Sequence, residues 1–410
     1  MTEEFRIERY RRSDRERVFD LMRVAIPVSA PTLIRNWHWM FDANPFNGDA
    51  ERNRTTNREG LLAFLRETYS AERLQSFVRR WGSSYAETLE QNAPYILLMK
   101  NDRDEVVAME AAQPQRYLVD SREQWVSVEG DWTVHPAYRG RKLAQALVNR
   151  LRNENTLGFA WQNPASRRAT KRWRKATAGR AKTSVSVSGD LPIVPLVKPI
   201  DWSAFAKLLA DNRLLGLAAS VAGAAARGFE WALARPASIE NVNLIQIESF
   251  DESADELWQR AHRNHTVLAV RDQRYLNWRF RDRPGSLYTI LTAVRDSSLR
   301  GYLVFRISDH VGTSCGFIVD TFYDDVEIFS LLIREAEKIL RTAGVKAIVC
   351  SVATTSHRSV LLWQGFFPLL YSRRNYLAAW GNSTDPQVQS FFDVSRWFIS
   401  MGDGNLDMGF

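Results

Sequence analysis

The most informative segment of the sequence is TVHPAYRGRKLAQALVNRL, which runs from Thr133 to Leu151. A strand-like run ends at Val134, and apolar residues then recur at helical spacing at Leu143, Leu147 and Leu151. A turn from a strand into a helix directs unpaired backbone N–H groups and the positive end of the helix dipole at one point. The stretch therefore predicts an anion site, with phosphate as the natural ligand.

The charge of the chain is concentrated beside this turn. The chain has a formal net charge of +8, and residues 139–183 hold thirteen Lys and Arg against one acidic residue, Glu154. One localised basic site is therefore expected, and its charge suits the phosphates of a small ligand as well as those of RNA.

Length and composition describe a globular chain of two or three domains, with 410 residues that are 45% hydrophobic and 25% charged. The two cysteines cannot supply a disulfide framework or a structural zinc site. Since MTEEFRIERYRRSD lacks the apolar core of a signal peptide, we expect a cytoplasmic protein. The apolar run at 214–226 is too short to span a bilayer. His262 and His265 form the one close histidine pair and have no third ligand nearby, so no metal site is predicted.

Strand-like runs at Tyr95–Lys100, Glu105–Asp120 and Trp125–Val134 are separated by turn residues, which predicts an antiparallel meander. A helix from about Gly140, a strand at Leu157–Gln162 and a further helix follow. This order predicts an α/β fold with a mixed, mostly antiparallel sheet flanked by helices.

An internal repeat suggests two copies of this fold. The pattern Trp-x-Phe-x-x-x-Pro begins at Trp39 and again at Trp278, and the pattern Ser-x6-Trp begins at Ser166 and again at Ser356. The two motifs lie farther apart in the first copy than in the second. The difference is about the length of a polar, amphipathic segment at 48–93, which we interpret as a helical insertion. The expected domains are 1–190 with that insertion, a linker with an Ala-rich helix at 191–238, and a second copy at 239–410.

The turn resembles the signature of the GNAT superfamily of acyl-CoA-dependent N-acyltransferases. That signature is Gln/Arg-x-x-Gly-x-Gly/Ala after the fourth strand, and here it reads Arg139-Gly140-Arg141-Lys142-Leu143-Ala144. The preceding VHPAYRG and the helix after NPAS also resemble the family, across most of 1–190 and more faintly across 240–380. Lys142 departs from the pattern, which has its first glycine there. N-Myristoyltransferases, which are also tandem GNAT proteins, likewise have a basic residue at this place.

The resemblance implies a site for an acyl-CoA, with acetyl-CoA as the simplest donor. The backbone amides of Arg139, Gly140, Arg141, Lys142, Leu143 and Ala144 would hold the pyrophosphate. The strand before them would separate from its neighbour, and an N–H group of Trp132, Thr133 or Val134 would then bind the thioester carbonyl. The hydroxyl of Ser166 would lie near the pantetheine, and the basic helix that follows could meet the 3′-phosphate or be a solvated cationic face.

Transfer to an amine needs a base, because an amine with a pKa of about 10.4 is mostly protonated at neutral pH. Glu129 and Asp131 are the candidates, since strand alternation places both on one face. Glu110 on the neighbouring strand is third. The family's usual tyrosine acid has no counterpart here, because no tyrosine occurs between Tyr138 and Tyr275.

The second copy lacks the signature, since Asp320, Asp324 and Asp325 stand where it would be and would repel phosphate. We therefore expect one CoA site, with the second copy on the acceptor side. The leading hypothesis is an N-acyltransferase that moves an acyl group, acetyl first, to a primary amine of a small molecule or amino sugar by direct attack. Two alternatives remain: a Fem-type transferase that uses aminoacyl-tRNA, and a non-catalytic GNAT scaffold that binds nucleic acid or a membrane surface.

Overall fold

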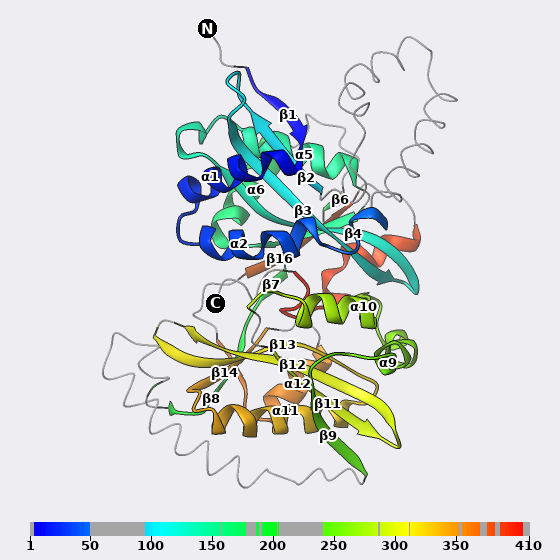
Figure 1. Cartoon of the computed structure of the whole chain (residues 1–410). Coiled ribbons are helices and arrows are strands. Elements are labelled where there is room, and N and C mark those ends of the chain that lie inside the picture. The colour runs from blue at the N-terminus through cyan, green and yellow to red at the C-terminus, as the bar shows by residue number, and fades with distance from the viewer. Residues whose placement is uncertain are drawn as a thin grey trace.

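The computed structural model describes the chain in ranges that leave several gaps. These ranges are 4–49, 95–155, 157–177, 186–187, 191–202, 204, 241–285, 288–310, 312–351, 355–369, 375–381 and 386–404. The expected insertion, apart from its first two residues, and the Ala-rich helix lie outside them. Two mixed sheets, each flanked by helices, lie one above the other in Figure 1. The predicted α/β fold is therefore confirmed.

The first sheet is built mainly by the first half of the chain. Its order is β1 (Arg6–Arg9), β2 (Tyr95–Lys100), β3 (Val106–Val119), β4 (Arg122–Val134), β5 (Leu157–Gln162), β16 (Asn375–Gly381) and β6 (Ser186–Val187). Strands β1 to β4 are antiparallel neighbours, as the meander predicts, and β5 runs parallel to β4. Three further strands are paired with members of this sheet. β7 (Leu191–Ile193) pairs with β16, β10 (Val267–Ala269) pairs with β3, and β17 (Trp397–Phe398) pairs with β10.

The second sheet repeats this order. It runs β9 (Val242–Ile247), β11 (Tyr288–Arg295), β12 (Ser298–His310), β13 (Thr313–Tyr323), β14 (Ala347–Cys350), β8 (Leu196–Pro199) and β15 (Phe367–Pro368). Strands β13 and β14 are parallel, like β4 and β5 in the first sheet. The shared order supports the interpretation of the chain as two copies of one fold.

The two halves exchange a strand. β8 comes from the end of the first half and pairs with β14 of the second sheet, while β16 comes from the second half and pairs with β5 of the first sheet. Residues 191–199, which the sequence analysis assigns to the start of a linker, are thus largely strands of the two sheets. Each sheet is completed by the other half of the chain.

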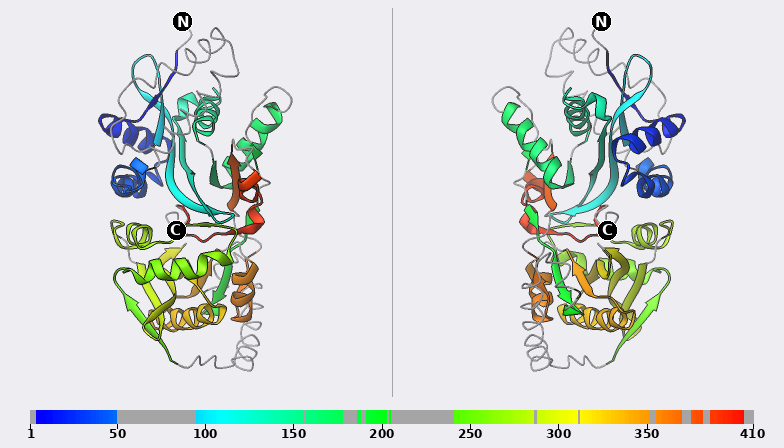
Figure 2. Two further views of the ribbon diagram at one scale, coloured as in Figure 1. Left: turned by 90° about the vertical axis from the view of Figure 1, so that its right-hand side faces the viewer. Right: turned by 90° about the vertical axis from the view of Figure 1, so that its left-hand side faces the viewer.

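Helices cover both faces of the first sheet. α1 (Arg15–Ala25) and α2 (Ala30–Trp37) lie on one face, and α5 (Leu143–Glu154) and α6 (Pro164–Thr177) lie on the other, as Figure 2 shows. The predicted apolar stripe of α5 packs onto β2 and β3, because Leu143, Leu147 and Leu151 share one buried cluster with Leu97 and Met99. This packing fixes the first turn of α5 at the end of β4.

In the second half, α9 (Ser253–Ala261) and α10 (Gln273–Leu276) lie between β9 and β11 in the chain, and α11 (Val326–Thr342) and α12 (Thr355–Trp363) follow β13 and β14. The repeated tryptophan motif joins the halves. Trp39 and Trp278 lie in equivalent π-helical turns, and their rings stack with centroids 5.1 Å apart. Each indole N–H donates to the backbone carbonyl of the other residue, at 2.7 and 3.3 Å. The repeat therefore marks a near-symmetrical contact between the two copies.

Candidate active site

The backbone of β4 carries a bulge near its end. Met109 pairs with Thr133 and Ala111 pairs with Gly130, so two residues of β4 lie opposite Glu110 alone. Asp131, one of these two, has a left-handed backbone with a φ of 60°. An extra residue of this kind bends the strand and redirects its side chains.

Beyond the bulge, β4 and β5 separate. Their pairing ends at Glu129 and Ala160, although β4 continues to Val134 and β5 to Gln162. Among the described residues, the edge of β4 that faces β5 has no ladder pairing with β5 beyond Glu129. We call this gap the first opening. It is the strand separation that the resemblance implies.

The turn after β4 forms one side of a pocket of about 370 Å³. Gly140 has a φ of 86°, Lys142 has a φ of 63°, and α5 begins at the next residue. The pocket is lined by Ala25, Ile26, Trp132, Thr133, Val134, Tyr138, Arg139, Gly140, Lys142, Leu143 and Ala144. Most of the residues singled out for CoA binding thus surround one pocket at the start of a helix.

The left-handed backbone of Lys142 explains why the family prefers glycine at this place. A residue with a β-carbon pays about 1–2 kcal/mol for this conformation, whereas glycine adopts it freely. The side chain of Lys142 is exposed beside the pocket. Its presence adds a cation where the family pattern has none.

Two predicted ligand residues, Arg141 and Ser166, are not among those that line this pocket. Arg141 does not line the pocket, and its guanidinium lies 5.1 Å from the ring centroid of Tyr138 and 5.9 Å from that of Phe5. The hydroxyl of Ser166 donates to the carbonyl of Asn163, at 3.1 Å, at the start of α6. The structure does not bring either side chain to the pocket.

Arg139 lines the pocket and also fixes its wall. Its guanidinium donates to the carbonyl of Ala25 at the end of α1, at 3.1 Å, and to the carbonyl of Val134, at 3.4 Å. The arginine therefore holds the end of α1 against the turn. Ala25 and Ile26 are wall residues that the sequence analysis missed, because no local pattern relates a helix end to a turn more than a hundred residues away.

The two candidate bases differ sharply in their surroundings. Both carboxylate oxygens of Glu129 accept from Arg152 of α5, each at 2.8 Å, and both residues are largely buried. Asp131 has a buried oxygen, Oδ2, that finds no hydrogen-bond partner among the described residues. Burial raises the pKa of Asp131 to about 6.

Glu110 lies opposite the bulge and is buried. Burial, together with the charge of Glu129, raises the pKa of Glu110 well above its usual value. The sequence analysis missed Arg152, although its position on α5 one residue after Leu151 could have suggested that it reaches the sheet.

The second sheet has an equivalent bulge and opening. Val319 is the extra residue of β13, and pairing with β14 ends at Ile318 and Cys350. Here, however, the chain itself fills the gap with residues Ile399–Gly404, which we call the closing segment. The N–H of Gly402 donates to the carbonyl of Val319 at 2.8 Å, and the hydroxyl of Ser400 donates to Asp320 at 2.7 Å.

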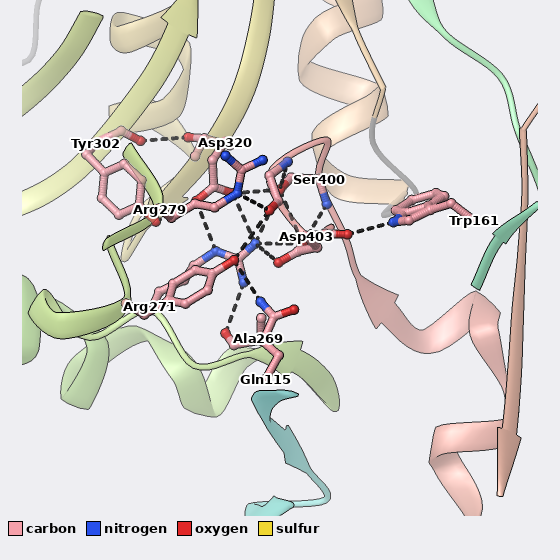
Figure 3. A network of polar contacts seen from close by, with 12 residues as sticks. Gln115, Trp161, Ala269, Arg271, Arg279, Tyr302, Asp320, Ser400 and Asp403 are labelled. Carbon is pink, nitrogen blue, oxygen red and sulfur yellow. Dashed lines mark hydrogen bonds and ion pairs between the residues drawn. The ribbon is translucent and has the colours of Figure 1, made fainter. Parts of the chain in front are cut away.

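A buried arginine locks the closing segment in place, as Figure 3 shows. The side chain of Arg271 is fully buried and donates to Asp320 at 3.0 Å and to Asp403 at 2.8 Å. Burial by itself would lower the pKa of Arg271, but the two carboxylates outweigh it and hold that pKa well above its usual value. Asp320, which the sequence analysis expected to repel phosphate, is thus occupied by an internal ion pair.

The comparisons with known proteins show the family and the fold of the chain. The model of the acetyltransferase (GNAT) family matches residues 59–157 and 248–366, one region in each half. The chain belongs to the GNAT family. No curated protein matches the sequence significantly.

Solved structures share the fold at low sequence identity. A probable N-acyltransferase from Enterococcus faecalis V583 is 10% identical, with a TM-score of 0.52 over 92% of this chain and 72% of its own. A GCN5-related N-acetyltransferase from Anabaena variabilis gives 10% identity and a TM-score of 0.51 over the same shares. N-Myristoyltransferase from Saccharomyces cerevisiae, solved with myristoyl-CoA and inhibitors, is 10% identical in sequence. Its TM-score is 0.51 over 94% of this chain and 83% of its own.

Two further observations concern the described ranges alone. None of their helices has the length and apolar character needed to cross a bilayer. No three His, Cys, Asp or Glu side chains in these ranges gather as metal ligands.

Proposed function

We propose that this GNAT protein transfers an acyl group, acetyl first, from acyl-CoA to a primary amine of a small molecule or amino sugar. The observation that carries the proposal is the pocket at the first turn of α5, which lies where β4 leaves β5. An acyl-CoA needs both features next to each other, because its phosphates require an anion pocket and its thioester arm requires a gap between strands. Both cysteines are free and buried, which suits a reducing compartment, and the proposal places the enzyme in the cytoplasm.

The residues of the pocket fit the anionic end of such a donor. The turn offers backbone N–H groups and the positive end of the α5 dipole, with Arg139 and Lys142 as nearby cations. Gly140 has open space on the side where a β-carbon would stand, so the backbone there can be approached closely. In this proposal the pyrophosphate binds at 139–144.

The thioester would then lie along β4 in the first opening. An N–H group of Trp132, Thr133 or Val134 donates to the thioester carbonyl and stabilises the oxyanion that forms when the amine nitrogen attacks the carbonyl carbon. The C–S bond breaks as the tetrahedral intermediate collapses, and CoA leaves as its thiolate. The second half of the chain forms the acceptor side.

We assign the proton transfer to Asp131 rather than to Glu129. A base must be unpaired and must have a pKa not far below the working pH. Asp131 meets both conditions, whereas the oxygens of Glu129 are taken by Arg152. Asp131 accepts the proton from the attacking amine, directly or through one water molecule.

Replacing Asp131 with asparagine is expected to raise the melting temperature at pH 7.5 and leave it unchanged near pH 4. The pKa of Asp131 is about 6 in the folded chain and about 3.9 when unfolded, so the wild type loses stability as the pH rises through this window. Asparagine does not ionise and tolerates the left-handed backbone at this position. Melting curves from pH 4 to pH 8 measure the difference.

The same variant is expected to lose acyl transfer by about a hundredfold or more, the usual contribution of a positioned base. Glu129→Gln is the matched control, which removes a charge from the ion pair with Arg152 and should lower stability instead. Equal melting temperatures for Asp131→Asn and wild type at every pH would contradict the assignment of Asp131.

Thermal shift with acetyl-CoA, longer acyl-CoAs and bulk tRNA tests the function itself. We expect stabilisation by acyl-CoA, because a ligand that binds the folded state alone raises the melting temperature. The shift should depend mildly on salt, whereas binding to RNA weakens steeply and log-linearly with salt. Stabilisation by tRNA alone would favour the Fem-type alternative and overturn the proposal.

A further inference from the structure

Trp161 occupies a special place on β5. The last pair between β4 and β5 joins Glu129 to Ala160, so Trp161 is the first residue of β5 inside the first opening. Its ring packs edge to face against Phe159, with centroids 6.3 Å apart. Trp161 therefore begins at the narrow end of the opening, where its ring packs on the apolar cluster that contains Phe159 and Val128, while the pocket at α5 lies at the other end of the last residues of β4.

The closing segment holds this indole from the other half of the chain. The indole N–H donates to the carbonyl of Asp403 at 2.6 Å, as Figure 3 shows. Gly404 packs directly on the ring, since a β-carbon there would lie 2.8 Å from the indole nitrogen and 3.5 Å from Val128. Gly404 also has a φ of 117°, a backbone conformation that glycine alone adopts readily.

The closing segment is itself rigidly bound. Arg271 joins Asp403 to Asp320, and Arg279 donates to the carbonyls of Gly402 and Gly404, both at 3.0 Å. All these partners belong to the second half of the chain. The position of Trp161 is therefore set by the segment that fills the second opening.

Little space remains behind the closing segment. A cavity lined in part by Gln113, Tyr275, Gly402 and Gly404 holds about 10 Å³, which is room for about one water molecule. The side of the closing segment that faces this cavity therefore offers no room for an acyl chain.

We infer that Trp161 is the residue that limits the acyl group to a short chain. The inference rests on the proposed function, because a pyrophosphate bound at α5 directs the thioester arm along β4 toward the narrow end. From Gly130 to Val134 the strand makes four steps of about 3.3 Å and spans about 13 Å, so in this pose the pantetheine arm lies along the strand and the acyl group, rather than the nucleotide, reaches the indole. Acetyl fits before the ring, and a longer chain collides with it.

The test compares acetyl-, butyryl-, hexanoyl- and octanoyl-CoA on the full chain by calorimetric titration. In the wild type we expect the longer donors to bind at least tenfold more weakly than acetyl-CoA, since one methylene in a pocket changes affinity by about 10- to 200-fold. Trp161→Ala should recover that loss for hexanoyl- and octanoyl-CoA and change acetyl-CoA by less than threefold. Trp161→Leu is a second, milder variant with the same expected direction.

Trp161→Phe is the matched control, because it loses the N–H bond to Asp403 but keeps a ring that blocks the opening. It should retain the preference for short chains. Free CoA should bind the wild type and all three variants equally. An unchanged chain-length profile in folded Trp161→Ala and Trp161→Leu would overturn the inference while leaving the proposed function intact. A wild type that binds neither free CoA nor any acyl-CoA would overturn the proposed function, and the inference with it.

Discussion

Replacing Trp380 with alanine is expected to destabilise the chain by about 4 kcal/mol, the usual cost of removing a buried tryptophan side chain. Trp380 lies on β16, is completely buried, and packs in one cluster with α5 and with β2 and β3 of the other half. Its ring also lies 5.4 Å from the guanidinium of Arg152. The substitution therefore loosens the strand that completes the first sheet.

Both sheets should unfold together in this variant, as they should in the wild type. β16 cannot leave the first sheet, nor β8 the second, without exposing the edges of β5 or β14. Urea unfolding followed by far-ultraviolet circular dichroism and by tryptophan fluorescence should give one coincident transition. Trp363→Ala is the control, because that tryptophan is 78% exposed and its loss should cost less than about 0.5 kcal/mol. Two separate transitions, with the second unaffected by Trp380→Ala, would show that the halves fold independently.

The sequence predicts the local part of the site well. The strand, turn and helix around Gly140 follow from the helical spacing of three leucines and from the position of a basic turn, and the structure places a pocket there. The order of β2, β3 and β4 also follows from local turns, because antiparallel neighbours are joined by short connections.

Long-range pairing could not be predicted in the same way. The exchange of β8 and β16 joins residues far apart in sequence, and no local pattern distinguishes an exchanged strand from one that stays in its own sheet. The closing segment shows the same limit, because its partners Arg271 and Asp320 are spread over the second half.

The choice between the two candidate bases depends on their side-chain partners, which strand alternation in the sequence does not reveal. Glu129 and Asp131 look equivalent in the sequence, but a bulge separates them and Arg152 pairs with Glu129 alone among the two. Ser166 has the residue type expected near a ligand, yet its hydroxyl bonds the backbone at the start of its own helix, as serine often does there.

The two openings of the molecule have different contents. In the second, the closing segment and Arg271 take the place that a ligand would occupy. In the first, the described pairing between β4 and β5 ends early and a pocket adjoins the end of β4. This difference explains in physical terms why we propose a single donor site in a chain with two copies of the fold.

The anion pocket at α5 is the central claim, and Ala144→Glu tests it most directly. Ala144 is largely buried where it lines the pocket in the first turn of α5, so a longer side chain there extends into the pocket, where the positive end of the helix dipole stabilises a carboxylate in the folded chain. The same carboxylate would repel a bound pyrophosphate. Ala144→Gln is the matched control, since it has nearly the same size without the charge.

The measurement is calorimetric titration of CoA into the wild type and both variants at low and moderate salt. We expect measurable binding to the wild type, at least a hundredfold loss in Ala144→Glu, and a smaller loss in Ala144→Gln. CoA binding of wild-type strength in a folded Ala144→Glu variant would show that the phosphates bind elsewhere and would rule out the pocket at α5.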